Sequence, residues 1–241
     1  MRNLVKLAIL LFVCIIIGGF TLILYNKLST KVNYQKSVFD TQKVSCRELA
    51  EPQLKSMTTE TRGNSKTPIY IIDDFLSPTI CNNIIKELKS KLKPSTLTRN
   101  DPTDPYFRTS STGIFSKSSA QDFVNKKMSD VIMAKKSEIP QIQHYNISQE
   151  FKPHWDGFDP KHDKKFYDKG QRSWTFMIYL NNVEEGGETH FPNLRETVVP
   201  KLGRAVIWYN LDKNGELDRD TLHQGNPIIK GEKYIITKWF N

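Results

Sequence analysis

The sequence predicts an α+β protein with a jelly-roll or β-sandwich core, in which the helices come first and the strands follow. Eight short runs between residues 141 and 240 are rich in β-branched and aromatic residues, and turn residues separate them. Many short strands of this kind form jelly rolls or sandwiches. Two segments with the apolar spacing of helices precede them, and this order is typical of α+β folds.

An apolar segment near the N-terminus predicts a single membrane anchor. Residues 7–25 are 19 consecutive uncharged, mostly apolar residues, and a helix needs about 20 to cross a bilayer. A cleaved signal peptide has a shorter apolar core and a small-residue cleavage site, and neither is present. We therefore expect a short tail over 1–6, a transmembrane signal anchor over 7–25, a polar stalk or linker over 26–66 and one folded domain over 67–241.

The net charge of +9 does not indicate nucleic-acid binding. Residues 1–39 contain five basic and no acidic residues, and the remainder has 30 Lys and Arg against 26 Asp and Glu. This small excess is typical of a solvated surface. Basic residues stand on both sides of the apolar segment, so the positive-inside rule gives no strong orientation. We expect a single-pass membrane protein whose body lies in the lumen of the endoplasmic reticulum.

The folded domain is expected to begin with a strand and two helices. "PIYIIDDF" over 68–75 is a β-like run, and Ser77 followed by Pro78 is a helix start signal. Apolar residues at 80, 84, 85, 88 and 92 share one helical face, which predicts a helix as far as Leu92. A long loop over 93–113 leads to a second helix over 119–136. The eight candidate strands cover 141–147, 151–156, 173–181, 188–191, 196–200, 204–210, 221–225 and 233–240.

A His-x-Asp pair in the second of these strands predicts half of a metal site. His154 and Asp156 are two residues apart, so a strand presents both side chains to one face. Two histidines and one carboxylate form the facial triad of non-haem Fe(II) oxygenases. His190 and His223 are both available as the third ligand. Spacing favours His223, because it precedes a turn and then the last strand.

The last strand carries a lysine that fits the same hypothesis. Lys233 lies ten residues after His223, and period two places it on one inward face with Ile235, Thr237 and Trp239. A buried lysine needs an anionic partner. A dicarboxylate cosubstrate would supply that partner.

These motifs resemble the 2-oxoglutarate- and Fe(II)-dependent prolyl 4-hydroxylases over residues 67–241. The resemblance rests on "HWD", "GGETHF", "KLGRAVIWYN" and "DTLHQGNPIIKGEKYIITKW". It implies a dioxygenase catalytic domain with a double-stranded β-helix (jelly-roll) core and flanking N-terminal helices. The implied iron ligands are His154, Asp156 and His223. The implied cosubstrate residues are Lys233 and Tyr145 at the distal carboxylate of 2-oxoglutarate, with Thr189 and Trp239 lining the cosubstrate or peptide pocket.

Three further residues are implied in contact with the substrate. Arg108 lies in "YFRTSSTGIF", which is similar to the family's mobile loop over the peptide groove. Arg172 in "GQRSWTFMIYLN" matches a basic position linked to peptide binding. Phe151 departs from the family, which usually has Tyr at this position, and the departure concerns substrate contact rather than the metal.

The implied activity is hydroxylation of peptidyl proline to 4-hydroxyproline with O2 and 2-oxoglutarate, which gives succinate and CO2. The implied cofactors are Fe(II), 2-oxoglutarate and L-ascorbate as reductant, and the implied partners are a proline-containing peptide or protein and the membrane. Two alternatives stay open: another 2-oxoglutarate oxygenase acting on lysyl residues or a small molecule, and a non-catalytic binding module. The sequence also leaves open whether Cys46 and Cys81 pair, and whether Asn146 in the sequon "NIS" is glycosylated.

Overall fold

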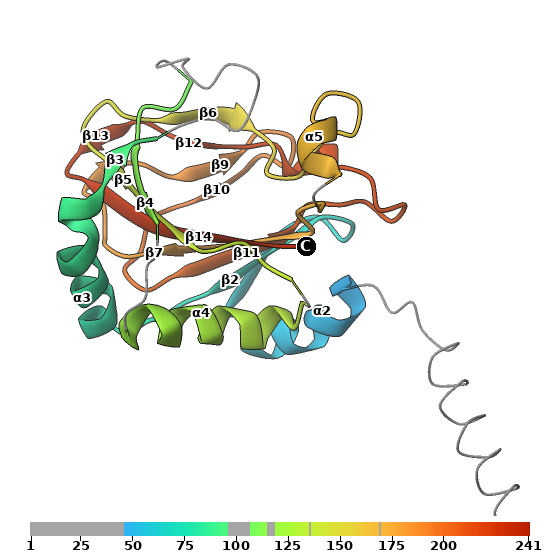
Figure 1. Ribbon diagram of the computed structural model, residues 1–241, viewed down its shortest axis with the longest axis horizontal. Helices are drawn as coiled ribbons and strands as arrows, with labels where there is room; N and C mark the ends of the chain where they lie inside the picture. Colours follow the sequence, from blue (N-terminus) through green and yellow to red (C-terminus); the bar gives the residue numbers. More distant parts are fainter. Residues whose placement is uncertain (1–45, 96–106, 115–118, 135, 169) are drawn as a thin grey trace, which may run out of the picture. The chain divides into compact units, whose positions relative to one another are not determined.

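The computed structural model describes residues 46–95, 107–114, 119–134, 136–168 and 170–241 (Figure 1). The helices are α2 Cys46–Met57, α3 Pro78–Leu88, α4 Ser119–Ile132 and α5 Lys164–Tyr167, and the 3-10 turns are η1 Lys89–Lys91 and η2 Arg219–Thr221. The strands are β1 Glu60–Gly63, β2 Pro68–Ile72, β3 Lys93–Pro94, β4 Ser111–Ile114, β5 Gln141–Tyr145, β6 Phe151–His154, β7 Trp174–Tyr179, β8 Glu185–Gly186, β9 Thr189–Phe191, β10 Glu196–Val198, β11 Ala205–Tyr209, β12 His223–Gly225, β13 Ile228–Lys230 and β14 Lys233–Phe240.

Two sheets face each other, and helices cover the outer side of the larger one (Figure 1). The larger sheet has the order β1-β2-β11-β7-β14-β5-β4-β3, the smaller has the order β10-β9-β12-β6, and β13 pairs with β8. Phe191 of β9 and Val198 of β10 pack in one buried cluster with Ile69 of β2 and Tyr179 of β7. The two sheets therefore share a core, as the run of short strands predicted.

The central strands of the larger sheet are buried on both faces. Successive side chains of a strand point to opposite sides, so each strand contributes to both layers. In β14, Ile236 and Phe240 belong to the cluster on the helix side. Lys233, Ile235 and Trp239 instead line a pocket on the inner side. The predicted inward face of the last strand is confirmed.

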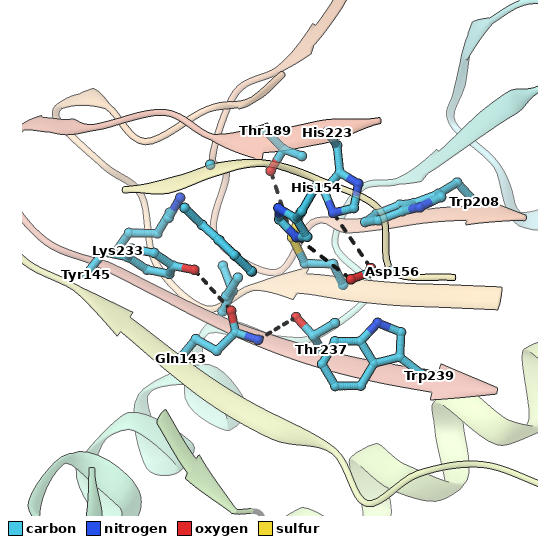
Figure 2. Close-up of a pocket in the computed structure, with 14 residues that line it drawn as sticks. Gln143, Tyr145, His154, Asp156, Thr189, Trp208, His223, Lys233, Thr237 and Trp239 are labelled. Atoms are coloured by element: carbon cyan, nitrogen blue, oxygen red, sulfur yellow. Dashed lines mark hydrogen bonds and ion pairs between the residues drawn. The ribbon is translucent and has the colours of Figure 1, made fainter. Parts of the chain in front are cut away.

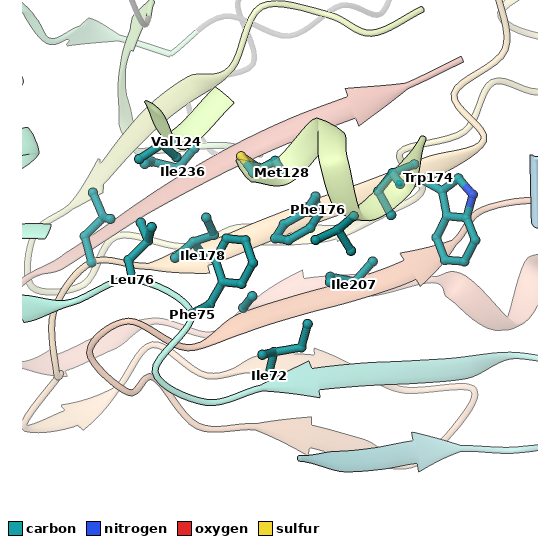
Figure 3. Packing of buried hydrophobic residues seen from close by; sticks show 14 of the residues in the cluster. Ile72, Phe75, Leu76, Val124, Met128, Trp174, Phe176, Ile178, Ile207 and Ile236 are labelled. Atoms are coloured by element: carbon teal, nitrogen blue, oxygen red, sulfur yellow. The ribbon is translucent and has the colours of Figure 1, made fainter. Parts of the chain in front are cut away.

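Helix α4 closes the outer face of the larger sheet. Val124 and Met128 of this helix pack in the same cluster as Phe176, Ile178 and Ile236 of the sheet (Figure 3). Full burial of each such side chain contributes about 1.5–3 kcal/mol. This layer supports from behind the strands that carry the pocket.

Both predicted helices are present, and both end before the predicted last residue. The Ser77 hydroxyl accepts a hydrogen bond from the Ile80 amide at 3.4 Å, and Pro78 is the first helical residue of α3, as predicted. Helix α3 ends at Leu88 and tightens into η1. Helix α4 ends at Ile132 because Met133 has a φ of 53°, which no α-helix accommodates.

The prediction of a linker as far as residue 66 is wrong in its second half. Helix α2 buries Ala50 and Leu54 in the core on the helix side. Strand β1 pairs antiparallel with β2, with Glu60 opposite Ile71. The sequence signal was weak because α2 has few apolar residues and β1, "ETRG", has none. The predicted loop over 93–113 likewise contains β3 and the start of β4.

The predicted anchor over 7–25 lies outside the described residues. Within the described ranges, no helix is long and apolar enough to span a membrane. Cys81 is a free, buried thiol in α3. Asn146 lies in an exposed turn just after β5, where the Gln149 amide donates to its carbonyl at 3.0 Å.

Candidate active site

His154, Asp156 and His223 lie together between the two sheets (Figure 2). His154 ends β6 and lies opposite His223, the first residue of β12, in antiparallel register. Asp156 follows two residues after His154, and its Oδ1 is 3.8 Å from His154 Nε2. Its Oδ2 is 3.7 Å from His223 Nε2. The pairing of two short strands thus gathers two imidazoles and a carboxylate around one point.

Backbone carbonyl groups orient both imidazoles. His154 Nδ1 donates to the Lys152 carbonyl at 2.8 Å, and His223 Nδ1 donates to the Thr221 carbonyl at 2.9 Å. Because Nδ1 carries the proton in each ring, Nε2 keeps its lone pair on the side of Asp156. Burial, with the neighbouring His223 as a second cause, lowers the pKa of His154 to about 3. The ring is therefore neutral, as a metal ligand must be.

The donor set fits Fe(II). Burial alone would raise the pKa of Asp156, but His223, His154 and Arg172 hold it below its usual value, so the carboxylate is ionised. Two neutral imidazoles and one carboxylate are the donors of the facial triad, which leaves positions for other ligands. The ligand atoms of the three residues lie within 4.8 Å of one another, and no other such group of three occurs in the described part of the chain.

A pocket extends from this triad along the inner face of the larger sheet (Figure 2). Its other lining residues are Gln143, Tyr145, Phe151, Met177, Thr189, Trp208, Gly225, Lys233, Ile235, Thr237 and Trp239. Most of this surface is apolar or aromatic, with a few polar groups that converge on the interior, which is the usual composition of a small-molecule site.

Lys233 occupies the end of the pocket away from the triad (Figure 2). Its side chain is buried, and its Nζ donates to the Gly187 carbonyl at 2.9 Å and lies 4.4 Å from the centre of the Tyr145 ring. Burial lowers the pKa of Lys233 to about 7. The described residues provide it with no ion pair. An anionic group bound in the pocket would complete this site, and a carboxylate of 2-oxoglutarate fits it.

Two glycines make the contact with Lys233 possible. Gly186 and Gly187 have φ values of 79° and 74°, a region that side chains disfavour. A Cβ on Gly186 would lie 2.3 Å from the Pro227 carbonyl oxygen, and one on Gly187 would lie 2.6 Å from Ile228 Cδ1. The pair therefore lets the backbone approach closely enough for the Gly187 carbonyl to reach the ammonium.

A glutamine that the sequence analysis missed bridges the floor of the pocket. The Tyr145 hydroxyl donates to Gln143 Oε1 at 3.1 Å, and Gln143 Nε2 donates to Thr237 Oγ1 at 3.3 Å (Figure 2). Gln143 lies two residues before Tyr145 on β5, so period two alone places both on one face. Trp208 and Met177 were also missed, because nothing distinguishes their residue types from ordinary core.

Thr189 and His190 are neighbours on β9, and their side chains point to opposite faces of the strand. Thr189 lines the pocket, and its hydroxyl oxygen is 2.6 Å from the Tyr179 hydroxyl. His190 faces the other side, where its Nδ1 is 2.8 Å from Thr197 Oγ1. The choice of His223 rather than His190 as the third member of the triad agrees with this arrangement.

Phe151 flanks the triad. Its ring stacks on His154 with centroids 3.5 Å apart and planes at 19°. The guanidinium of Arg108 lies 4.8 Å from the Phe151 ring centre and donates to the hydroxyls of Ser110 and Thr112, each at 3.1 Å. Arg108 therefore packs against Phe151, which lines the pocket. The predicted contact of Arg108 with substrate stays a prediction.

Arg172 supports Trp239 and is not one of the residues that line the pocket. Its Nε and Nη2 donate to the Glu138 carboxylate at 2.5 Å and 2.8 Å. Its guanidinium carbon lies 3.8 Å from the Trp239 ring centre. The structure therefore gives Arg172 a packing role that the sequence did not indicate, and its predicted contact with substrate stays a prediction.

Comparisons with known proteins agree with this geometry. Residues 140–241 match the family described as the 2OG-Fe(II) oxygenase superfamily. The chain is 32% identical over 205 residues to probable prolyl 4-hydroxylase 7 of Arabidopsis thaliana, covering 73% of this chain and 64% of that protein. It is 32% identical over 200 residues to probable prolyl 4-hydroxylase 6 of the same plant, covering 71% of this chain and 68% of that protein.

A viral enzyme of known structure is similar to the chain in both fold and sequence. It is the viral collagen prolyl hydroxylase of Paramecium bursaria Chlorella virus-1 in complex with 2-oxoglutarate, with a TM-score of 0.58 and 30% identity over 71% of this chain and 94% of that one. A prolyl hydroxylase from Trichoplax adhaerens has a TM-score of 0.60 at 16% identity, over 83% of this chain and 94% of that one, and shares the fold. The chain spans about two thirds of the length of the plant relatives above.

Proposed function

The chain belongs to the prolyl 4-hydroxylase family of 2-oxoglutarate- and Fe(II)-dependent oxygenases, and on that premise we propose that it hydroxylates prolyl residues of a peptide or protein. The reaction would consume O2 and 2-oxoglutarate and give 4-hydroxyproline, succinate and CO2. We take the two facing sheets as the double-stranded β-helix core of this family, with α2, α3 and α4 as its flanking helices.

The observation that carries the proposal is one pocket with a facial triad at one end and, at the other, a buried lysine that has no ion pair among the described residues. His154, Asp156 and His223 would hold Fe(II), and Lys233 with Tyr145 would hold the distal carboxylate of 2-oxoglutarate. Fe(II) with 2-oxoglutarate supplies the oxidising chemistry that inserts one oxygen atom of O2 into a C–H bond.

The side chains of this pocket bind, orient and exclude water. The Lys233 ammonium is set by the Gly187 carbonyl, so it needs no reorganisation to meet a carboxylate. Trp208, Trp239 and Ile235 give the pocket apolar walls, which strengthens the electrostatic contacts inside it and keeps water from the reacting groups. L-ascorbate would serve as the reductant that returns oxidised iron to Fe(II).

The test is succinate release by the full chain with Fe(II), 2-oxoglutarate and ascorbate, with and without collagen-like or proline-rich peptides. We expect peptide-stimulated turnover, and a gain of about 16 mass units on proline. His223→Ala should abolish turnover. His190→Ala should retain it, because the His190 side chain lies on the face of β9 that points away from the pocket. Turnover without stimulation by either peptide would assign the enzyme to a lysyl or small-molecule substrate, and no turnover would leave a binding module.

We also propose that residues 7–25 anchor the protein in the endoplasmic reticulum membrane with its body in the lumen. The composition of that segment supports the proposal. Asn146 offers a direct test, because its sequon lies in an exposed turn. A lumenal body should acquire an endoglycosidase-sensitive glycan in eukaryotic cells, and Ser148→Ala should remove it. A chain that stays unglycosylated and is digested by protease added outside intact microsomes would refute the lumenal orientation.

A further inference from the structure

Behind the carboxylate of the triad lies a chain of two hydrogen bonds between buried side chains. The Thr175 hydroxyl donates to Asp156 Oδ2 at 2.8 Å, and Asn210 Nδ2 donates to Thr175 Oγ1 at 2.9 Å. Thr175 and Asn210 are completely buried, and neither lines the pocket. They therefore cannot contact a substrate, and any effect they have on the chemistry must pass through Asp156.

The two neighbouring strands of the larger sheet build this chain. Thr175 lies on β7 directly opposite Trp208 of β11, and Asn210 follows β11 by one residue. The backbone of Asn210 is fixed on both sides, because its amide donates to the Ser173 carbonyl at 2.8 Å and its carbonyl accepts from the Asp218 amide at 2.9 Å. A Cβ on Gly157, the residue after Asp156, would lie 2.8 Å from Leu217 Cδ1 and 3.4 Å from Asn210 Cβ, so the segment after Asp156 packs closely on Leu217 and in van der Waals distance of Asn210.

The donor and acceptor groups allow only one direction for these two hydrogen bonds. The Nδ2 group of Asn210 can only donate, so it occupies a lone pair of Thr175 Oγ1. The single hydroxyl proton of Thr175 is then committed to Asp156 Oδ2. A carboxylate oxygen that accepts this bond is a weaker metal donor than its free partner. Each oxygen lies near one imidazole, Oδ1 at 3.8 Å from His154 Nε2 and Oδ2 at 3.7 Å from His223 Nε2. The Thr175 bond is therefore what distinguishes them, and it favours Oδ1 as the metal donor.

We propose that Thr175 and Asn210 are positioning residues that fix the rotation of the Asp156 carboxylate, so that one oxygen binds the metal. This inference rests on the proposed metal site and goes beyond it, because it assigns a task to two residues outside the pocket. A freely rotating carboxylate could present both oxygens and occupy a position that a cosubstrate requires. The chain of hydrogen bonds keeps that position open.

Metal binding tests the proposal without turnover. The full chain would be titrated with Co(II), and both the Kd and the visible ligand-field spectrum would be recorded. We expect Thr175→Val to weaken binding roughly 10- to 100-fold and to change the spectrum. Thr175→Ser, which keeps the hydroxyl, should restore both. Thr58→Val is the control, because the Thr58 hydroxyl donates to the Leu54 carbonyl of α2 at 2.6 Å and contacts neither the pocket nor Asn210.

Asn210→Leu supplies a second, independent variant. It should weaken Co(II) binding in the same direction, and the double variant with Thr175→Val should bind no more weakly than Thr175→Val alone, because Asn210 acts through Thr175. Wild-type affinity and spectrum in both single variants would overturn this inference while the metal site stands. No Co(II) binding by the wild-type chain would overturn the proposed function as well. Thermal unfolding of each variant would show that the compared proteins are folded.

Discussion

The Lys233 ammonium donates a hydrogen bond to the Gly187 carbonyl at 2.9 Å, and the side chain is buried. A neutral carbonyl does not compensate a buried charge, and the pKa of Lys233 falls to about 7 as a result. Among the described residues Lys233 has no ion pair, and a bound anion would supply one. The affinity of the pocket for an anionic ligand should therefore depend on the charge of Lys233.

Lys233→Met should abolish tight binding of 2-oxoglutarate and leave the metal in place. Loss of one partner from a buried ion pair costs about 3–5 kcal/mol, so we expect the Kd of 2-oxoglutarate to rise at least about 100-fold in calorimetry with Mn(II). Lys238→Met is the matched control, since Lys238 is buried on the opposite face of β14 and donates to Ser129 of α4 at 2.8 Å. Equal losses in the two variants would contradict the role of Lys233.

Binding of 2-oxoglutarate should weaken as the pH rises above 7. The free protein loses the Lys233 proton near pH 7, and a bound carboxylate restores it, so the affinity should fall by up to about tenfold per pH unit above that value. Calorimetry between pH 6 and 9 measures this slope. Lys233→Arg should flatten it, because arginine stays charged throughout. A flat profile in the wild-type chain would show that the ammonium stays protonated without ligand.

The same residue gives the stability of the ligand-free protein a defined pH dependence. The unfolded chain keeps the Lys233 proton up to its usual pKa of about 10.4, whereas the folded chain releases it near 7. Between these values the unfolded state binds more protons, so the contribution of Lys233 to the free energy of unfolding should rise with pH. Urea unfolding of the wild-type chain and Lys233→Met across this range isolates that contribution, and parallel curves would refute it.

The residues of the candidate site could be predicted from the sequence better than the packing of the helices and sheets around them. Lys233 with Ile235 and Trp239 follow from period two within β14. The spacing of His154 and Asp156 also indicated a pair, although β6 ends at His154 and Asp156 lies two residues beyond it. Gln143 follows the same rule from Tyr145 and could have been found by it. Patterns within one strand are local, and a sequence displays them directly.

Contacts between distant segments could not be predicted in this way. The pairing of Arg172 with Glu138, 34 residues apart, depends on how the start of β7 meets the segment before β5. Helix α2 buries Ala50 and Leu54 in the core and packs Met57 against it, within a segment of low mean hydropathy. Such contacts arise from packing, and neither composition nor periodicity of either segment shows them.

Metal should stabilise the folded chain measurably. A ligand that binds only the native state adds about 2.7 kcal/mol at a free concentration of 100 Kd, so Mn(II) should raise the unfolding temperature of the metal-free protein and a chelator should reverse the rise. His223→Ala should remove this response and His190→Ala should keep it, because His190 faces away from the triad. A response that survives His223→Ala would place the metal elsewhere.

Arg172 and Glu138 should behave as one unit. The Arg172 guanidinium is buried, binds Glu138 through two nitrogens and stacks on Trp239. A double-mutant cycle with Arg172→Gln and Glu138→Gln, followed by urea unfolding, should give a coupling energy of about 0.5–3 kcal/mol. Lys126 and Asp130 form the matched control, since this pair is exposed on α4 and contacts at 2.7 Å.

For that exposed pair the expected coupling is about 0.3–0.5 kcal/mol. The difference between the two cycles measures what burial and bidentate geometry add to an ion pair of this protein. Arg172→Lys should fail to replace the native residue, because an ammonium retains the charge but cannot form the planar fork or the stack on Trp239. Equal coupling in the two cycles, or full replacement by lysine, would mean that Arg172 contributes only its charge and that Trp239 holds its place in the pocket without it.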